Sequence, residues 1–333
     1  MYKISDKPLV SIITPSYNQG KYLEAAMQSV LAQRDDSFRL EYLVVDGGST
    51  DGSQEIIRCH AADLAWWVSE ADHGQADAIN KGFRRAQGDI VAWLNSDDLY
   101  LPGVISSAVQ ALQSNPELGM VFGDAITIDG QGVPLNHLVF GDWGLAELVR
   151  FRIICQPAVF MRRAALEKAG YLAAEYHYML DHHLWLRIAC HSPIKHVKHT
   201  WAAARQHAQA KNVAQAAGFS QETMRLLQWI QTQPEFSELV KHNSRKIMGG
   251  AYRLSARYYL DGGMPSQALK AYMKAFWYYP AYTLQHWHRI LFAMLCLVGG
   301  KGMAGWYEKF RRKADFSDIA NLEDWYGICL KQK

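Results

Sequence analysis

Two adjacent aspartates follow an apolar run in the N-terminal half of the chain. Residues 90–94 have the composition of a buried strand, so Asp97 and Asp98 are expected to project from a sheet edge into a cleft. Such carboxylates bind Mg²⁺ or Mn²⁺ together with substrate phosphates, so a diphosphate is the expected partner. The alternative is that Asp98 caps a helix beginning near Pro102 and that Asp97 is merely exposed. The pair alone favours neither interpretation.

Acidic residues also recur after other predicted strands. The turns concerned are residues 15–18, 46–49, 69–72 and 95–98, and three of these four contain a carboxylate. Gly, Asn, Asp and Ser are common in any tight turn, so a single turn of this kind indicates little. Because ligands of parallel sheets bind beyond the carboxyl ends of the strands, the recurrence favours one shared binding site.

Strands and helices alternate along this part of the chain and would hold these turns at one edge. The predicted strands are residues 9–14, 42–45, 65–68, 90–94 and 120–122. The predicted helices between them are residues 20–33, 53–62, 75–87 and 103–113. This alternation predicts an α/β fold with a mostly parallel sheet. Farther on, we expect a strand entering from a loop at 156–161, a helix at 180–190 and helical structure from 221 onward.

The composition is that of an ordinary globular protein. With 49% apolar and 20% charged residues over 333 positions, a disordered or fibrous chain is excluded. The five cysteines form no CxxC pair, and their odd number leaves one unpaired in any disulfide scheme, which favours a reducing compartment. The N-terminus reaches the first strand without the apolar core of a signal peptide. We therefore expect a cytoplasmic protein.

Several segments in a fixed order make a specific resemblance. Residues 10–18 (VSIITPSYN), 42–52 (YLVVDGGSTDG) and 69–82 (SEADHGQADAINKG) precede Asn95-Ser96-Asp97-Asp98. Together, residues 10–100 resemble the family 2 glycosyltransferases with a GT-A fold. The resemblance implies a Rossmann-like nucleotide-diphospho-sugar transferase fold, with a mixed, mostly parallel sheet flanked by helices. It also implies an inverting enzyme with a nucleotide-sugar donor, expected to be UDP-linked, and a divalent cation, Mn²⁺ or Mg²⁺.

The resemblance assigns roles to residues of the donor site. It implies that Asp46 hydrogen-bonds the nucleotide base and that Asp97 holds the metal ion. Asn95 departs from the Asp-X-Asp motif of the family but retains groups that can hydrogen-bond the sugar or ribose. The other donor-binding residues that the resemblance implies are Pro15, Tyr17, Asn18, Asp72, Gly74, Gln75, Asp77 and Ser96.

A further carboxylate lies in residues 178–187 (YMLDHHLWLR), which resemble the acceptor-side motif of the family. The resemblance implies that Asp181 is the general base, which takes the proton of the acceptor hydroxyl. The alternative role of Asp181 is a helix N-cap. Residues 201–211 resemble a late segment that returns to the donor site. There His207 is implied as a second metal ligand, and Arg205 or Lys211 as a partner of the diphosphate.

The C-terminal region carries the basic charge of the chain. Residues 241–313 contain thirteen Lys or Arg against two acidic residues, a net charge of +11 that leaves −8 for the remainder. Together with fourteen aromatic residues, this composition suits an anionic membrane surface. The apolar run 290–298 is too short to cross a bilayer, and packing on the first domain is the alternative. No nucleic-acid-binding motif accompanies the charge, so no nucleic-acid partner is expected.

The predicted organisation is a GT-A domain at 1–220 followed by a helical basic and aromatic region at 221–333. The domain divides into a donor-binding half at 1–124 and an acceptor-side half at 125–220. The predicted function is sugar transfer to a hydroxyl of a glycan or lipid-linked glycan in cell-surface polysaccharide synthesis, at the inner face of the plasma membrane. The alternatives are a catalytically degenerate scaffold or assembly factor of the same fold at the membrane, and a nucleotidyltransferase, which would be expected to have a Gly-rich, basic loop after the first strand.

Overall fold

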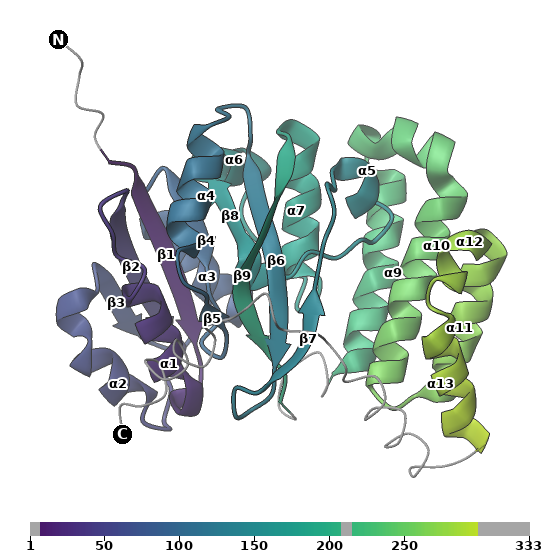
Figure 1. Cartoon of the computed structure of the whole chain (residues 1–333), viewed down its shortest axis with the longest axis horizontal. Helices are drawn as coiled ribbons and strands as arrows, with labels where there is room; N and C mark the ends of the chain where they lie inside the picture. The colour runs from purple at the N-terminus through teal and green to yellow at the C-terminus, as the bar shows by residue number, and fades with distance from the viewer. Residues whose placement is uncertain (1–6, 208–214, 299–333) are drawn as a thin grey trace.

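A layered α/β region and a group of C-terminal helices make up the fold (Figure 1). The structure is a computed structural model that describes residues 7–207 and 215–298. In the first part of the chain, strands and helices alternate as the sequence predicts. The elements are β1 (Leu9–Ser16), α1 (Gly20–Leu31), β2 (Arg39–Asp46), α2 (Ser53–Cys59), β3 (Trp66–Ser69), α3 (Gln75–Arg85), β4 (Ile90–Trp93), β5 (Leu99–Tyr100) and α4 (Val104–Gln113).

The middle of the chain contains strands that its less regular pattern does not reveal. Its elements are β6 (Met120–Ile128), β7 (Pro134–Leu138), α5 (Leu145–Leu148), η2 (Gln156–Ala158), β8 (Val159–Arg162), α6 (Arg163–Ala169), α7 (Leu180–His191) and β9 (Ile194–Arg205). The strand expected at 156–161 begins only at Val159, because a short 3₁₀ turn precedes it. The helix expected at 180–190 is present as α7.

In the described part of the chain, nine strands form one sheet in the order β3-β2-β1-β4-β8-β6-β9-β5, with β7 paired to β6. The strands β3, β2, β1 and β4 run parallel. In the register, Ser16 lies opposite Asp46, and Asp46 lies opposite Ser69. The carboxyl ends of these strands therefore meet at one edge, as the sequence predicts, and the sheet is mixed but mostly parallel on this side.

The other half of the sheet brings distant segments to the same edge. β8 runs antiparallel to β4 and β6, whereas β9 runs parallel to β6 and ends with Arg205 opposite Ile128. The two-residue strand β5 follows the Asp97-Asp98 turn and pairs with β9, so that Leu99 faces Ala203. The end of β9 is therefore held beside the turn that follows β4.

The C-terminal helices extend the fold at the far side of the sheet from β1 (Figure 1). They are α9 (Ala216–Thr232), a short turn η3 (Pro234–Phe236), α10 (Ser237–Asp261), α11 (Pro265–Tyr278), α12 (Pro280–Leu284) and α13 (Trp287–Val298). The predicted break at Gly262-Gly263 separates α10 from α11. The break predicted at Gly299-Gly300 lies outside the described residues. Among residues 7–207 and 215–298, no helix is both long enough and apolar enough to cross a membrane.

One hydrophobic core joins α9 and α10 to the sheet. The same cluster of buried side chains contains Ile13 and Trp93 from the sheet, Trp185 from α7, Leu227 from α9 and Leu254 from α10. Helices α9 and α10 therefore pack on the α/β region. By contrast, the fully buried residue of α13 is Ala293, and most of that helix is partly or fully exposed.

Because the core is shared, Leu254→Ala is expected to destabilise the whole protein by about 2–5 kcal/mol. Unfolding in urea, followed by circular dichroism and by tryptophan fluorescence, should remain a single coincident transition at a lower midpoint. Leu291→Ala on exposed α13 is the control, with an expected change within about 0.5 kcal/mol. A variant in which the C-terminal helices unfold alone, while the sheet stays folded, would contradict the shared core.

Candidate active site

Backbone hydrogen bonds and a buried tryptophan hold the turn after β4 against the sheet. The backbone N–H of Leu94 donates to the carbonyl of Ile13, and the N–H of Asp98 donates to the carbonyl of Asn95. The last residue of β4, Trp93, is buried and stacks on Trp185 of α7. The backbone that carries the candidate carboxylates is therefore fixed before any ligand binds.

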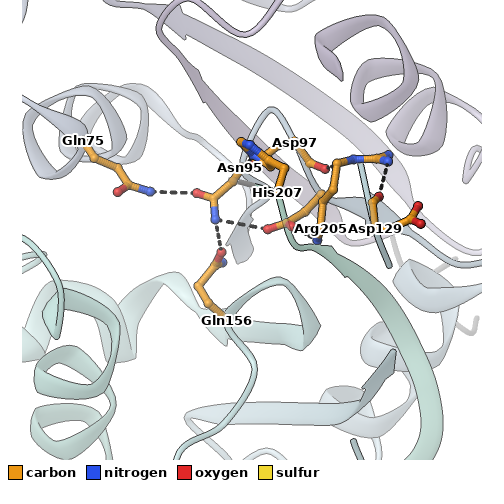
Figure 2. A network of polar contacts seen from close by, with 8 residues as sticks. Gln75, Asn95, Asp97, Asp129, Gln156, Arg205 and His207 are labelled. Carbon is orange, nitrogen blue, oxygen red and sulfur yellow. Dashed lines mark hydrogen bonds and ion pairs between the residues drawn. The ribbon is translucent and has the colours of Figure 1, made fainter. Parts of the chain in front are cut away.

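Asn95 lies in the middle of a chain of side-chain amides (Figure 2). Gln75 at the start of α3 donates to Asn95 Oδ1 over 2.9 Å. The Asn95 amide then donates to Gln156 Oε1 at 3.0 Å and to Asp98 Oδ2 at 3.2 Å. Gln156 in turn donates to the carbonyl of Trp93 at 2.8 Å. Both amide hydrogens of Asn95 are used inside the protein, so its contact with sugar or ribose is limited to its carbonyl oxygen.

Asp98 is a buried structural carboxylate. Its Oδ1 accepts a hydrogen bond of 2.9 Å from the backbone N–H of Arg205, and its side chain faces Asn95. Burial raises the pKa of Asp98 to about 8, and the neighbouring charge of Asp97 acts in the same direction. The alternative helix-cap role is wrong, because α4 begins after Gly103 with no side-chain cap. Asp98 instead joins the β4 turn to the end of β9.

Asp97 points toward residues from the end of β9. Its Oδ2 lies 3.1 Å from Nε2 of His207, and its backbone carbonyl accepts from Nε of Arg205 at 2.9 Å. The Arg205 guanidinium also donates to the carbonyl of Asp129 and lies over the ring of Tyr22, 4.8 Å from the ring centroid. The structure thus brings together the two residues that the sequence suggested as metal ligands. Lys211 lies outside the described residues.

The Asp97–His207 pair suits a metal ion that also binds phosphate. Within the described ranges, no group of three or more His, Cys, Asp or Glu side chains forms a ready-made metal site. The side chains of Asp97 and His207 are 21% and 8% exposed, and they come from two different loops. Mn²⁺ and Mg²⁺ commonly take one or two protein ligands and complete their shell with water and substrate phosphates. The residues present fit this mode of binding.

Asp46 organises the loop after β2. Its fully buried carboxylate accepts hydrogen bonds from the backbone N–H groups of Gly48 and Ser49 and from the hydroxyls of Ser49 and Ser69, over 2.5–3.1 Å. Three of these bonds go to Oδ2 and one goes to Oδ1, so Oδ1 keeps an acceptor site. Its role in base binding stays a prediction.

The loop after β1 lies against the loop after β2. Asn18, with φ of 50°, donates its N–H to Ser49 Oγ at 2.8 Å and accepts from the N–H of Thr50 at 2.9 Å. Pro15, one residue before the end of β1, pairs with Val45, whereas Tyr17 is 62% exposed. The ring of Tyr17 is thus available to stack on a ligand at the strand ends.

Because Gly47 in the loop after β2 has no side chain, Asp72 and Tyr17 can approach this loop. A Cβ on Gly47 would lie 2.7 Å from Asp72 Oδ2 and 3.2 Å from the ring of Tyr17. Asp72 also accepts from the N–H of Gly74, which adopts φ of 106° immediately before α3. Asp77, in the first turn of α3, accepts from the N–H of His73 at 3.2 Å. Asp72 and Tyr17 therefore converge on Gly47.

Asp181 lies in the first turn of α7. It is not the N-cap that the alternative interpretation suggested, because that position is Met179. Its carboxylate accepts from the N–H of His182 at 2.7 Å, and burial raises its pKa to about 6. The charges of Asp98 and Asp181 both raise the pKa of Cys155, so this thiol lies within electrostatic range of both carboxylates.

The sequence did not indicate that two further residues belong to this site. Gln156 and Tyr22 contact the predicted residues but belong to segments distant from them in the chain. The only sequence signal for Gln156 was its position just before the strand expected at 156–161. Ser96, which the resemblance suggested as a donor-binding residue, is buried in the turn after β4.

The sheet and the residues at its edge define an α/β protein whose candidate ligand site lies at the carboxyl ends of parallel strands. Residues 11–168 match Glycosyl transferase family 2. A putative teichuronic acid biosynthesis glycosyltransferase, TuaG of Bacillus subtilis, is 44% identical over 100 residues, which are 28% of this chain and 37% of TuaG. An uncharacterized glycosyltransferase of Nostoc sp. is 36% identical over 115 residues, which are 34% of this chain. Residues 11–168 are therefore a family 2 glycosyl transferase domain, which confirms the predicted family.

Solved structures share the fold across a larger part of the chain. The mannosyltransferase PcManGT from Pyrobaculum calidifontis, in complex with GDP-Man and Mn²⁺, has a TM-score of 0.59 at 19% identity and covers 99% of this chain and 89% of its own. TarS 1–349 of S. aureus in complex with UDP-GlcNAc has a TM-score of 0.56 at 16% identity and covers 81% of this chain and 89% of its own. The predicted GT-A fold is thus confirmed. By sequence, the chain spans 35% and 46% of the length of the first curated relatives it matches.

The amide chain explains the departure from the Asp-X-Asp motif and leads to a prediction. In Asn95→Asp, a second carboxylate would replace a donor that lies 3.2 Å from Asp98. One proton can be shared by the pair at low pH, but both groups must ionise at high pH. We expect a loss of about 1–3 kcal/mol in the free energy of unfolding at pH 9 and a smaller loss at pH 6. Urea unfolding at the two pH values measures both.

A matched control for this variant is Asn115→Asp. Asn115 is an exposed turn residue whose Oδ1 accepts from the N–H of Glu117, a role that aspartate also fills. Its stability should be unchanged at both pH values. Equal stability of Asn95→Asp and the native protein at pH 9 would show that the amide orientation at Asn95 is not required.

Proposed function

We propose that the protein is an inverting glycosyltransferase that transfers a sugar from a nucleotide-sugar donor to a hydroxyl of a glycan or lipid-linked glycan. The observation that carries the proposal is the convergence of Asp97, His207 and Arg205 beside the carboxyl ends of β1 to β4. In parallel sheets this edge is where nucleotides bind. The family of residues 11–168 supports the reaction class.

In the proposed reaction the acceptor oxygen attacks the anomeric carbon as the bond from that carbon to the diphosphate breaks. Asp181 takes the proton of the acceptor hydroxyl, and the nucleoside diphosphate leaves with the bonding electrons. A carboxylate with a pKa near 6 is ionised at neutral pH yet more basic than an ordinary aspartate, which suits a general base. A cation held by Asp97 and His207 would offset the charge of the leaving diphosphate.

Two further features support donor binding at this edge. Exposed Tyr17 offers an aromatic face to a base, while Arg205 offers a guanidinium next to Asp97. TarS was solved with UDP-GlcNAc and PcManGT with GDP-Man and Mn²⁺, so this fold accommodates both nucleotides. We propose a UDP-sugar donor, and GDP-sugars are the comparison that any assay should include. The similarity to TuaG supports a place in cell-surface polysaccharide synthesis.

Asp97→Asn and Asp181→Asn test this function at two different steps. Removal of the metal carboxylate should weaken Mn²⁺-dependent binding of the donor nucleotide, measured by calorimetry with UDP and GDP. Removal of the base should leave that binding intact while transfer or donor hydrolysis falls by about 10²-fold or more. The matched control is Asp36→Asn, because Asp36 is fully exposed and pairs only with Lys7 in the described part of the chain.

The outcomes separate the proposed enzyme from its alternatives. A native protein that binds no nucleoside diphosphate, with or without Mn²⁺, would overturn the proposed function. Intact nucleotide binding together with full cellular function of Asp181→Asn would instead favour the degenerate scaffold. Transfer of a nucleotidyl group rather than a sugar would identify a nucleotidyltransferase.

The exposed side of α11 to α13 supports recruitment to an anionic membrane surface. On α13, Trp287, Leu291 and Met294 are between 42% and 61% exposed and recur at helical spacing. On α11, Met273 and Trp277 are 65% and 75% exposed. Lys270 and Lys274 of α11 are exposed and add positive charge, whereas Arg289 of α13 pairs with Asp261 at 3.1 Å. This combination favours an interfacial position among anionic headgroups at the inner face of the plasma membrane.

Vesicle co-sedimentation tests the membrane surface directly. The protein should bind vesicles of phosphatidylcholine and phosphatidylglycerol, and binding should weaken with salt and without the anionic lipid. The double variant Trp287→Ser and Leu291→Ser is expected to lower the partition coefficient about tenfold or more. Its control replaces Val133 and Val139, which are 56% and 65% exposed on the α/β region, with serine. Recruitment through this surface would be refuted if vesicle binding were unchanged both without the anionic lipid and in the double variant.

A further inference from the structure

A buried carboxylate from the C-terminal helices holds the segment that leads into α7. Glu222 of α9 is 8% exposed. Its Oε1 accepts from the N–H of His177 at 2.7 Å, and its Oε2 accepts from the N–H groups of Tyr178 and Met179 at 2.7 and 2.9 Å. Three consecutive backbone donors thus converge on one side chain.

These contacts hold the backbone immediately before the first turn of α7, which begins at Leu180. Met179 is the N-cap residue of α7, and no side chain at that position hydrogen-bonds the first turn. Hydrogen bonds from backbone N–H groups to a carboxylate are charge-assisted, and negative charge is stabilising near a helix N-terminus. Glu222 therefore fixes the start of α7, two residues before Asp181.

The same face of α9 makes further contacts with this segment. The hydroxyl of Tyr178 donates to Gln215 Oε1 at 2.8 Å, and the Tyr178 ring packs on Phe219 with centroids 5.0 Å apart. At Gly218 a Cβ would lie 2.4 Å from the Tyr178 ring, so only glycine allows this approach. Positions 215, 218, 219 and 222 follow helical spacing, so these residues contact the segment that leads into α7 from one side of α9.

We propose that Glu222 is a positioning residue for catalysis: its carboxylate sets the place of the first turn of α7 and, through it, of Asp181. The inference rests on the proposed role of Asp181 as the general base. It extends the active site to a helix beyond residue 215, which lies outside the family match at 11–168. Activity of the catalytic domain then requires α9.

Glu222 also acts on Asp181 through its charge. Groups of three other elements interact electrostatically with Asp181: Glu222 on α9, Tyr258 on α10 and Cys155 before β8. Burial is the main cause that raises the pKa of Asp181, and the negative charge of Glu222 raises it further. Loss of that charge therefore lowers the pKa of Asp181.

The test is Glu222→Gln in the full chain, assayed as Mn²⁺-dependent hydrolysis of a nucleotide sugar from pH 4.5 to 9. We expect kcat to fall about 10- to 100-fold with nearly unchanged KM, because the base is misplaced while the donor site is intact. The acidic limb of the kcat profile should move to lower pH, because Asp181 ionises more readily. Glu238→Gln is the control, since Glu238 is exposed on α10, and it should leave both quantities unchanged.

The two proposals fail in different ways. Full activity of Asp181→Asn would remove the base on which both depend. If Asp181→Asn is inactive but Glu222→Gln has the kcat of the native protein and the same acidic limb in its kcat–pH profile, the positioning role alone is wrong. Should Glu222→Gln not fold, Gln215→Leu removes the more exposed contact with Tyr178, and it is expected to lower kcat severalfold without moving the limb. An unchanged kcat in that variant would show that the contacts of α9 with this segment do not position Asp181.

Discussion

The buried carboxylate of Asp98 is the constraint on which the candidate site depends. A carboxylate away from water is costly unless it is hydrogen-bonded, and here the donors are the backbone N–H of Arg205 and the amide of Asn95. Asn95 belongs to the same turn, whereas Arg205 can reach Asp98 only if the end of β9 lies beside that turn, which the pairing of β5 with β9 ensures. The adjacent residue, Asp97, is thereby set opposite His207, two residues beyond the strand.

Much of the fold could be predicted because its strands are local apolar runs. β1, β2 and β4 are buried along most of their length, so their sequences show them directly. β9 could not be predicted in this way. Its first half carries exposed Lys and His, and its buried part is made largely of small Ala side chains beside Trp201. Only pairing with β6 and β5 makes this segment a strand, and such pairing has no local signal.

Site residues could be predicted from the sequence where a residue type within a single turn indicates its role. They could not be predicted where the role depends on contact between two segments that are distant in the chain. Asp97 and Asp98 were identified as a pair, but their opposite environments depend on Arg205, more than a hundred positions away. Gln156 and Glu222 show the same limit, since each acts on a backbone or amide group from another element. A Gln or Glu on a helix or turn is ordinary in sequence, and only its partner shows its role.

The hydrogen bonds divide the site into buried groups that bond to the protein and more exposed groups. The charges of the exposed groups support the proposal that the protein uses a cation. Asp46, Asn95 and Asp98 accept or donate several hydrogen bonds within the protein, so they hold the loops of the site in place. Asp72 and Asp97 are only partly buried and remain next to the exposed ring of Tyr17 and the loop end at His207, respectively. A diphosphate is itself anionic and would be repelled by these carboxylates. A divalent ion held by Asp97 would turn that repulsion into attraction, which is why we propose that Asp97 binds the metal rather than the sugar.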